Sequence, residues 1–356
     1  MEQKQKYLMK GNEAIAEAAI RNGCMHFFGY PITPQTEVSA YMSKVMPKIG
    51  GTFLQAESEV AAINMVLGAA SCGLRTMTSS SSPGISLKSE GISYIAGSDL
   101  PCVILNVMRG GPGLGGIQPS QADYWQATKA LGHGDFQLLA FAPSTVQEIV
   151  DLMGTAFDLS DKYRVPALIL ADGMLGQMME PVEFPENKGP SDASGKPYAT
   201  TGTGEKRKPN IVNSLYLKPD QLEKTILERY ERYELIKQNE VRVEEYLTED
   251  AEIITVAYGA TARVVRSAVE KAREEGIKVG MIRPITVWPF PEKSIASAAQ
   301  KVDNMLVVEM SMGQMVEDVR LAANGACNVS FFGRTGGIVP SPAEVLAEIK
   351  KLGGNK

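Results

Sequence analysis

The sequence predicts an α/β protein built on parallel sheets, and three observations support this fold class. Short apolar runs of strand character alternate with longer segments of helical periodicity along most of the chain, which is typical of parallel sheets with helices on both faces. The 356 residues are enough for two to three domains. Apolar residues make up 44% and charged residues 22%, as in ordinary globular proteins.

Residues 1–185 are predicted to form a first α/β domain. Asn12 and Gly23 are expected to bracket a helix over 13–22, because asparagine caps helix starts and glycine suits the left-handed residue after a helix end. Further helices are expected at 35–46, at 58–72, between 80 and 101, and at 145–163. Strands are expected at 24–28, 52–55, 75–80, 101–108 and 166–171.

Residues 186–250 differ in composition and are interpreted as a connecting segment. Gly, Pro, Ser, Asn and Thr dominate 186–215, which predicts a long surface excursion. A highly charged helix is expected from Pro219 to about Leu247. Its narrow apolar stripe consists of Leu222, Ile226, Tyr230 and Tyr233.

Residues 251–356 are predicted to form a second α/β domain. Strands are expected at 252–257, 277–282, 305–308 and 329–332. Helices are expected at 261–275, after the Gly313-Gln314 turn, and at 342–350.

Charge and hydropathy exclude several classes of protein. The formal net charge is −5 and the longest basic run is Lys206-Arg207-Lys208, which argues against nucleic-acid binding. No window approaches about 20 consecutive apolar residues, so no membrane span is expected. The segment 1–6 lacks the apolar stretch of a signal peptide. We therefore expect a cytoplasmic protein.

Histidine and cysteine counts argue against a metal centre on this chain. His26 and His133 are the only histidines, which excludes a His-rich site. The four cysteines are Cys24, Cys72, Cys102 and Cys327. They show no CxxC spacing, and an iron–sulfur cluster would need all four from distant segments. We interpret them as small apolar residues kept reduced.

Two loops invite a nucleotide or anion interpretation. The glycines of 110–116 lack the context of a dinucleotide fingerprint, because Pro112 interrupts the spacing and Pro119 follows where a helix should begin. A mobile glycine loop is the better interpretation. The serine-rich segment 78–84 has no lysine of a P-loop. Its hydroxyl and N–H groups still stand at a strand-to-helix junction, where an anion could bind.

Two charged residues stand out within apolar surroundings. Glu59 lies in the first turn of a helix of small residues, where the helix dipole alone also favours an acid and Glu57 would serve as well. Arg109 ends an apolar strand and precedes glycines. At the carboxyl edge of a parallel sheet it could bind a carboxylate through two hydrogen bonds, and a surface salt bridge explains it equally well.

Several motifs occur in one order along nearly the whole chain, with 186–250 matching least. In the first domain they are Met9-Lys10-Gly11-Asn12-Glu13-Ala14, Gly29-Tyr30-Pro31-Ile32-Thr33-Pro34, Gln55-Ala56-Glu57-Ser58-Glu59 with Gly68-Ala69, Met77-Thr78-Ser79-Ser80-Ser81-Ser82-Pro83-Gly84, Arg109-Gly110-Gly111-Pro112 and Gly132-His133-Gly134-Asp135-Phe136. In the second they are Arg283-Pro284, Trp288-Pro289-Phe290, Val308-Glu309-Met310 and Gly313-Gln314. With these motifs the chain resembles the alpha subunits of 2-oxoacid:ferredoxin oxidoreductases, most of all the branched-chain members that act on 2-oxoisovalerate (3-methyl-2-oxobutanoate).

The resemblance implies a fold and a set of partners. Residues 1–185 would be similar to the pyrimidine-binding domain of thiamine diphosphate enzymes, and 251–356 to the transketolase C-terminal domain. A separate beta subunit would bind the diphosphate and Mg²⁺, and this chain has no complete Gly-Asp-Gly motif. A gamma subunit and a small ferredoxin-like subunit with [4Fe-4S] clusters are expected to complete the complex, and ferredoxin to accept the electrons.

The resemblance also assigns roles to three residues. Glu59 matches the glutamate that hydrogen-bonds the cofactor's pyrimidine ring and favours its imino form, which requires a side chain withdrawn from bulk water. Arg109 matches the arginine that pairs with the 2-oxoacid carboxylate. Thr33 matches the threonine beside the substrate and cofactor. The implied reaction is oxidative decarboxylation to acyl-CoA and CO2, with coenzyme A as co-substrate and thiamine diphosphate shared with the beta subunit.

Three alternatives remain open at this point. The same chemistry could act on 2-oxoglutarate, pyruvate or an aryl pyruvate. The chain could be a non-catalytic structural subunit. The chain could also be a nicotinamide-dependent dehydrogenase, an interpretation supported only by the glycine loop of 110–116.

Overall fold

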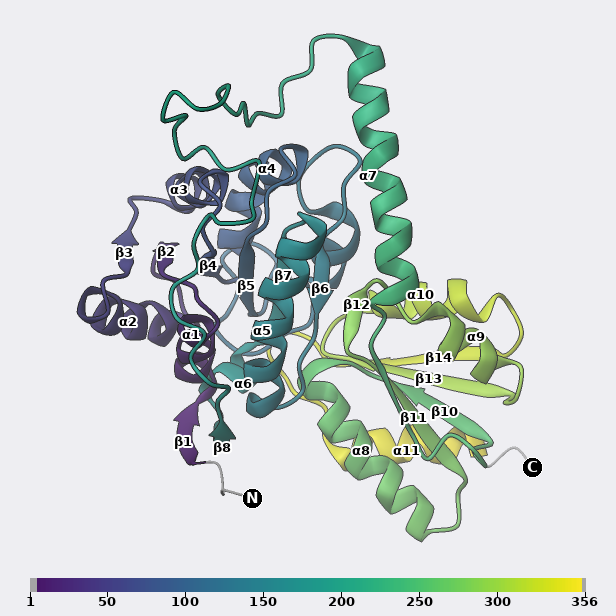
Figure 1. Cartoon of the computed structure of the whole chain (residues 1–356). Coiled ribbons are helices and arrows are strands. Elements are labelled where there is room, and N and C mark those ends of the chain that lie inside the picture. The colour runs from purple at the N-terminus through teal and green to yellow at the C-terminus, as the bar shows by residue number, and fades with distance from the viewer. Residues whose placement is uncertain (1–4, 354–356) are drawn as a thin grey trace.

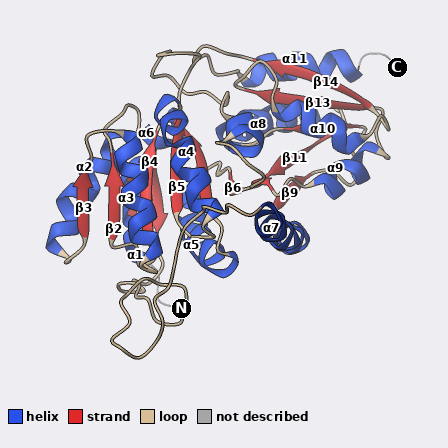
Figure 2. Cartoon of the chain, turned by 90° about the horizontal axis from the view of Figure 1, so that it is seen from above, coloured by secondary structure: helices blue, strands red, loops and turns tan. Residues whose placement is uncertain are grey.

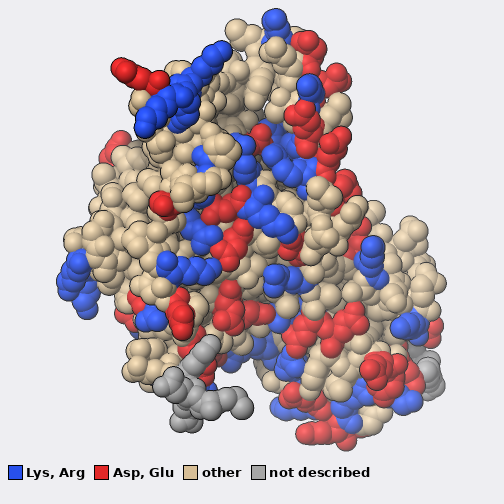
Figure 3. Space-filling view, viewed as in Figure 1, with Lys and Arg blue, Asp and Glu red and all other residues tan. Residues whose placement is uncertain are grey.

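The computed structural model describes residues 5–353, which form two halves with one large sheet each (Figure 1). Residues 1–4 lie outside the described part, and with them most of the segment in which we expect no signal peptide. Among the described residues, no helix combines the length and the apolar character needed to cross a membrane. Acidic and basic side chains are interspersed over the face drawn in Figure 3.

A seven-stranded sheet forms the first half, in the order β12-β6-β7-β5-β4-β2-β3. Its parallel strands are β2 (His26–Gly29), β3 (Thr52–Gln55), β4 (Thr76–Ser80), β5 (Val103–Met108), β6 (Leu139–Phe141) and β7 (Ala167–Asp172). Every residue of β4, β5 and β7 is buried, as expected for strands covered on both faces. The five predicted strands agree with β2, β3, β4, β5 and β7 to within two residues. The sequence does not predict β6, because three residues are too few to show a period.

Helices cover both faces of this sheet (Figure 2). They are α1 (Gly11–Arg21), α2 (Thr36–Val45) with a 3-10 turn (Met46–Lys48), α3 (Glu59–Ser71), α4 (Pro83–Gly97), a π-helical turn (Gln126–Ala130), α5 (Val146–Tyr163) and α6 (Gly173–Gln177). α3 packs against α4, whereas α1 packs against α2 and α5. A separate antiparallel ribbon pairs β1 (Lys6–Lys10) with β8 (Met179–Glu183).

The predicted cap of the first helix is wrong. α1 begins at Gly11, with Lys10 at the N-cap position, so Asn12 lies inside the helix. The Asn12 side-chain amide instead donates to the Pro34 carbonyl at 2.7 Å and to Glu37 Oε2 at 2.8 Å. Asn12 therefore ties α1 to the turn after β2, a tertiary role that local capping preferences do not reveal. Gly23 follows the helix with φ +84°, as predicted.

The second half contains a five-stranded sheet in the order β14-β13-β10-β11-β9. Its parallel strands are β10 (Ile253–Val256), β11 (Val279–Pro284), β13 (Asn304–Glu309) and β14 (Asn328–Gly333), and its antiparallel edge strand is β9 (Val243–Tyr246). The surrounding helices are α8 (Gly259–Glu274), α9 (Glu292–Ala299), α10 (Met315–Ala323) and α11 (Pro342–Gly353).

The charged helix α7 (Pro219–Asn239) is shorter than predicted. It ends eight residues before Leu247, because the chain then enters β9 of the second sheet. Of the predicted stripe, Tyr233 is buried and its ring meets Trp288 edge-on at 5.6 Å between ring centroids. Leu222 and Tyr230 are exposed. In Figure 1, α7 rises from the junction of the two halves to the loop that follows β8.

Three features join the two halves. Thr286–Trp288 forms β12, which pairs antiparallel with β6 and so extends the first sheet with a strand from the second half. Gln121 Nε2 donates to the Tyr258 carbonyl at 2.8 Å, and Gln121 Oε1 accepts from Met310 N at 3.0 Å. The third feature is an ion-pair cluster centred on Arg283.

The Arg283 guanidinium connects one helix of the first half with two strands of the second sheet. Its two terminal nitrogens each lie 2.9 Å from a carboxylate oxygen of Glu148 on α5. Its Nε lies 2.6 Å from Glu244 on β9. Burial opposes the charged form of Arg283, but the hydrogen bonds and charges of the two glutamates raise its pKa. Arg283 itself is buried, whereas Glu148 and Glu244 keep part of their surface exposed.

We expect Arg283→Met to lower the free energy of unfolding by about 3 kcal/mol, because Glu148 loses its cation and Glu244 keeps only Arg266. Urea unfolding of the full chain measures this change. Lys278→Met is the matched control. Lys278 Nζ lies 3.5 Å from a carboxylate oxygen of Glu252, and both side chains are half-exposed. Such surface ion pairs contribute about 0–1 kcal/mol to stability. Equal losses in the two variants would contradict the prediction.

Candidate functional site

The turns after three neighbouring parallel strands meet at the carboxyl edge of the first sheet. Thr33 follows β2, Ser80 ends β4 and Arg109 directly follows β5. Glu59 begins α3, which follows β3 at the same edge. Open α/β sheets bind their ligands at this edge. The fold thus brings all three predicted site residues to one end of the sheet.

Glu59 is buried at the N-terminus of α3, with 6% of its surface exposed. Ser58 caps this helix by accepting a hydrogen bond from Ala61 N at 3.2 Å. Among the described residues, nothing donates a hydrogen bond to the Glu59 carboxylate. The helix dipole favours a negative charge at this position. The carboxylate oxygens are not among the fully buried polar atoms that lack a partner, so they stay within reach of a ligand. A carboxylate in this state is suited to a ligand that supplies the donor.

The start of α4 lies directly against the Glu59 carboxylate. An ideal Cβ on Gly84 would lie 2.7 Å from Glu59 Oε1 and 2.1 Å from Ser80 Oγ, so any side chain at position 84 would collide with both. The hydroxyls of Ser80 and Ser81 are buried and have no hydrogen-bond partner among the described residues. Polar groups without partners therefore line the junction of β4 and α4.

Arg109 and Thr33 are in direct contact. Arg109 Nη1 donates to the Thr33 carbonyl at 2.8 Å, and Nη2 donates to the Leu114 carbonyl at 3.1 Å. Arg109 Nε is buried without a partner, and the side chain forms no ion pair within residues 5–353. The surface salt bridge that the sequence left open is therefore absent from the described part. Arg109 keeps donors available for an anion.

A buried network fixes the backbone beside Arg109. Ser82 has φ +21°, an unfavourable conformation for a residue other than glycine. Its N–H donates to Asn106 Oδ1 at 3.1 Å and its hydroxyl donates to Asp123 Oδ2 at 2.6 Å. The Arg109 N–H donates to the same hydroxyl at 3.0 Å. Burial raises the pKa of Asp123, although the hydrogen bonds that it accepts from Ser82 and Asn106 act in the opposite direction.

The glycine loop after Arg109 is not a dinucleotide fingerprint. No helix starts within 110–118, and Gly116 N bonds back to the Gly110 carbonyl at 2.9 Å. Gly115 has φ +57°, and a Cβ there would lie 1.8 Å from the Gly110 oxygen. Leu114 at the tip is 89% exposed. The loop is a tight, exposed turn that closes over the Arg109 side chain.

The remaining candidate groups do not form a reactive centre. Among residues 5–353, no group of three or more His, Cys, Asp or Glu side chains could hold a metal ion. Cys24 and Cys102 are buried, and burial raises the pKa of each thiol to about 12. Both thiols therefore stay protonated and unreactive at neutral pH.

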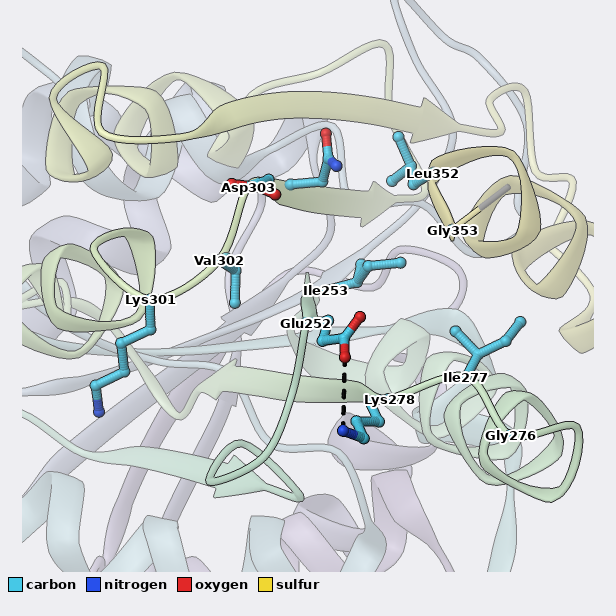
Figure 4. Close-up of a pocket in the computed structure, with 11 residues that line it drawn as sticks. Glu252, Ile253, Gly276, Ile277, Lys278, Lys301, Val302, Asp303, Leu352 and Gly353 are labelled. Carbon is cyan, nitrogen blue, oxygen red and sulfur yellow. Dashed lines mark ion pairs between the residues drawn. The ribbon is translucent and has the colours of Figure 1, made fainter. Parts of the chain in front are cut away.

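A hollow of about 350 Å³ lies at the other end of the second sheet (Figure 4). Ile253 and Asn304, which begin β10 and β13, contribute to its wall. It therefore lies at the amino ends of the strands, opposite the edge where such sheets bind ligands. Its dashed ion pair joins Glu252 and Lys278, both half-exposed. We do not assign the candidate site to this hollow.

Sequence reasoning missed two groups in the site. Lys88 on α4 is fully buried, and its Nζ donates to Thr78 Oγ1 at 2.6 Å and to the Ser79 carbonyl at 3.0 Å. A lone lysine among apolar residues at helical spacing, four residues after Gly84, was the available signal. The second group is the pair of Asn106 and Asp123, joined by a hydrogen bond of 2.8 Å. The sequence contains no signal for this pair, because it joins a strand to a loop 17 residues later.

Comparisons with known proteins agree with this fold and site. The family described as pyruvate flavodoxin/ferredoxin oxidoreductase, thiamine diphosphate-binding, matches residues 17–260. The family described as pyruvate:ferredoxin oxidoreductase core domain II matches residues 251–345. Ketoisovalerate oxidoreductase subunit VorB of Methanothermobacter thermautotrophicus is 50% identical over 98% of this chain and 98% of its own length.

Two solved structures share the fold. A 2-oxoglutarate:ferredoxin oxidoreductase from Magnetococcus marinus, with 2-oxoglutarate, coenzyme A and succinyl-CoA bound, is 27% identical with a TM-score of 0.86. The match covers 99% of this chain and 66% of that one, so this chain spans about two thirds of its length. The second is a split-gene transketolase that is 13% identical, with a TM-score of 0.60. The match covers 96% of this chain and 97% of that one, and it shows similarity of fold alone.

These matches confirm the predicted α/β fold class and the family resemblance. The chain carries both family regions in one polypeptide, in the order expected from its motifs. It therefore belongs to the pyruvate flavodoxin/ferredoxin oxidoreductase family, as one subunit of an oxidoreductase of the 2-oxoacid:ferredoxin type.

Proposed function

We propose that this chain is the alpha-type subunit of a CoA-acylating 2-oxoacid:ferredoxin oxidoreductase. In this proposal thiamine diphosphate lies between Glu59 and a beta subunit, and the substrate is a branched-chain 2-oxoacid. One observation carries the proposal: Glu59 is buried without a hydrogen-bond donor, at the sheet edge that also holds Thr33 and Arg109.

The residues at this edge fit the pyrimidine end of thiamine diphosphate. The cofactor offers ring N–H donors and acceptors, which match the Glu59 carboxylate and the unpaired hydroxyls of Ser80 and Ser81. Gly84 leaves room for the carboxylate where α4 lies against it. When bound, thiamine diphosphate supplies the nucleophilic carbon and the electron sink that decarboxylation of a 2-oxoacid needs.

The roles of the protein side chains follow from their chemistry. Glu59 would exchange a proton with the pyrimidine ring in a site that excludes water, which is general acid–base catalysis. The free donors of Arg109 would bind the substrate carboxylate. The Thr33 hydroxyl would orient the ketone, because Pro31 and Pro34 restrict the backbone on either side of it.

Partners follow from what the described residues lack. Since no group of acidic, His or Cys side chains in this part of the chain could hold a metal ion, we assign Mg²⁺ and the diphosphate to a beta subunit. We assign the [4Fe-4S] clusters to a small ferredoxin-like subunit and expect a gamma subunit in the complex. Coenzyme A would accept the acyl group, and ferredoxin the electrons.

Similarity to relatives supports a branched-chain substrate. The VorB relative, named a ketoisovalerate oxidoreductase, is 50% identical, against 27% for the structure with 2-oxoglutarate. That structure keeps 2-oxoglutarate as the second candidate.

We expect Glu59→Gln to lower turnover of the assembled complex at least about 100-fold, because the amide cannot exchange a proton with the cofactor ring. Stopped-flow reduction of ferredoxin measures the rate, and calorimetry checks that thiamine diphosphate still binds. Glu57→Gln is the control, since Glu57 is exposed two residues away. Full turnover of Glu59→Gln would favour a purely structural subunit.

We expect Arg109→Lys to raise KM for the 2-oxoacid about 30-fold or more, with a smaller change in kcat, because a lysine cannot replace the two-pronged contact with a carboxylate. Steady-state kinetics of the complex at varied oxoacid concentration measure both constants. Arg207→Lys, on the exposed excursion, is the control. An unchanged KM would remove Arg109 from the substrate site.

We expect 2-oxoisovalerate to give the highest kcat/KM among 2-oxoisovalerate, pyruvate, 2-oxoglutarate and phenylpyruvate. Its two methyl groups should favour it over pyruvate by about tenfold or more, since each buried methylene contributes about 1–3 kcal/mol of discrimination. Parallel assays with the complete complex decide this. A preference for 2-oxoglutarate would overturn the substrate assignment and leave the reaction type standing.

A further inference from the structure

Lys88 is the one lysine described here that is fully buried. It lies one helical turn after Gly84 on α4, so the two positions share a face of the helix. Long side chains in helices point back toward the N-terminus. The Lys88 side chain therefore runs toward Gly84, against which the Glu59 carboxylate rests.

The surroundings of Lys88 leave one charge to balance its own. α3 packs against α4, and β4 meets α4 here through the hydrogen bonds of Lys88 to the uncharged oxygens of Thr78 and Ser79. Glu59 on α3 is the charged group that raises the pKa of Lys88, although no direct ion pair joins the two among the described residues. The next buried carboxylate, Asp123, is bonded to Ser82. An ammonium group has three N–H donors, so one remains free after the hydrogen bonds to Thr78 and Ser79.

Burial and Glu59 act on Lys88 in opposite directions. Burial lowers the pKa of Lys88 to about 7, and the negative charge of Glu59 counteracts this lowering. A lysine is almost never buried without a partner of opposite charge. Below pH 7 Lys88 carries its charge and can attract the Glu59 carboxylate. Well above pH 7 Lys88 is neutral and the attraction disappears.

We propose that Lys88 is a positioning residue for Glu59: its buried ammonium group, anchored on β4 by Thr78 and Ser79, stabilises without direct contact the negative charge of the carboxylate that rests against Gly84. This inference rests on the proposed function, because it concerns the carboxylate assigned to the cofactor ring. The negative charge of the Glu59 carboxylate would face Lys88 in surroundings of low polarity, where such an interaction is strong. Lys88 would thereby favour the charged form of Glu59 that accepts a hydrogen bond from the cofactor ring.

A double-mutant cycle tests the pair without the cofactor. Lys88→Met, Glu59→Gln and the double variant of the full chain are unfolded with urea at pH 6 and at pH 9.5. We expect the two substitutions to be coupled at pH 6 by about tenfold in the unfolding equilibrium, and the coupling to vanish at pH 9.5. Lys44→Met on the surface of α2 is the matched control and should be additive with Glu59→Gln. Additivity of Lys88→Met at both pH values would overturn the proposal.

A second measurement needs no substitution at Lys88, in case that variant fails to fold. In the full chain with ¹³C-labelled lysine, NMR should show one lysine side chain titrating near pH 7. In Glu59→Gln this titration should move to lower pH, because the opposing charge is lost. A titration that stays in place would refute the pairing.

The results separate this inference from the proposed function. If the two substitutions are coupled but thiamine diphosphate does not bind the complex, the proposed function fails. If the cofactor binds and the two substitutions are additive, only the role of Lys88 fails.

Discussion

The burial of most of the Glu59 side chain at the start of α3 is the constraint on which the rest of the site depends. A buried carboxylate without a donor is unfavourable, so the fold must offset this cost locally. The N-terminus of α3 contributes its dipole, and Ser58 caps the helix so that its first turn stays in place. Gly84 lets α4 approach closely enough to exclude solvent while it leaves room for the carboxylate.

The second constraint is the position of Arg109 relative to the turn after β2. Arg109 is held from both sides: its backbone N–H bonds to Ser82, and its guanidinium bonds to the Thr33 carbonyl. Ser82 in turn is fixed by Asp123, in the loop that leads to the second half. An arginine fixed in this way has its remaining donors oriented before an anion arrives, which reduces the entropy lost on binding.

The second half of the chain supports the site from outside it. The loop after Arg109 is clamped to the carboxyl ends of β10 and β13, since Gln121 bonds to Tyr258 and Met310. Tyr124 donates to Asp318 of α10 at 2.6 Å. Asp123 lies between these anchors and reaches back to Ser82. Docking of the two halves therefore bears on the geometry around Arg109, although no residue of the second half was assigned to the site.

The sequence by itself determined the fold class and most of the strands, and it singled out Glu59, Thr33 and Arg109 as candidates, because periodicity, turn residues and family motifs are local signals. It did not determine that Asn12 holds the Pro34 carbonyl, that α7 gives way to β9, or that β12 joins the first sheet. Nor did it reveal the contact between Glu59 and α4. These features join segments far apart in the chain, and only tertiary packing decides which buried polar groups meet and which remain without a partner.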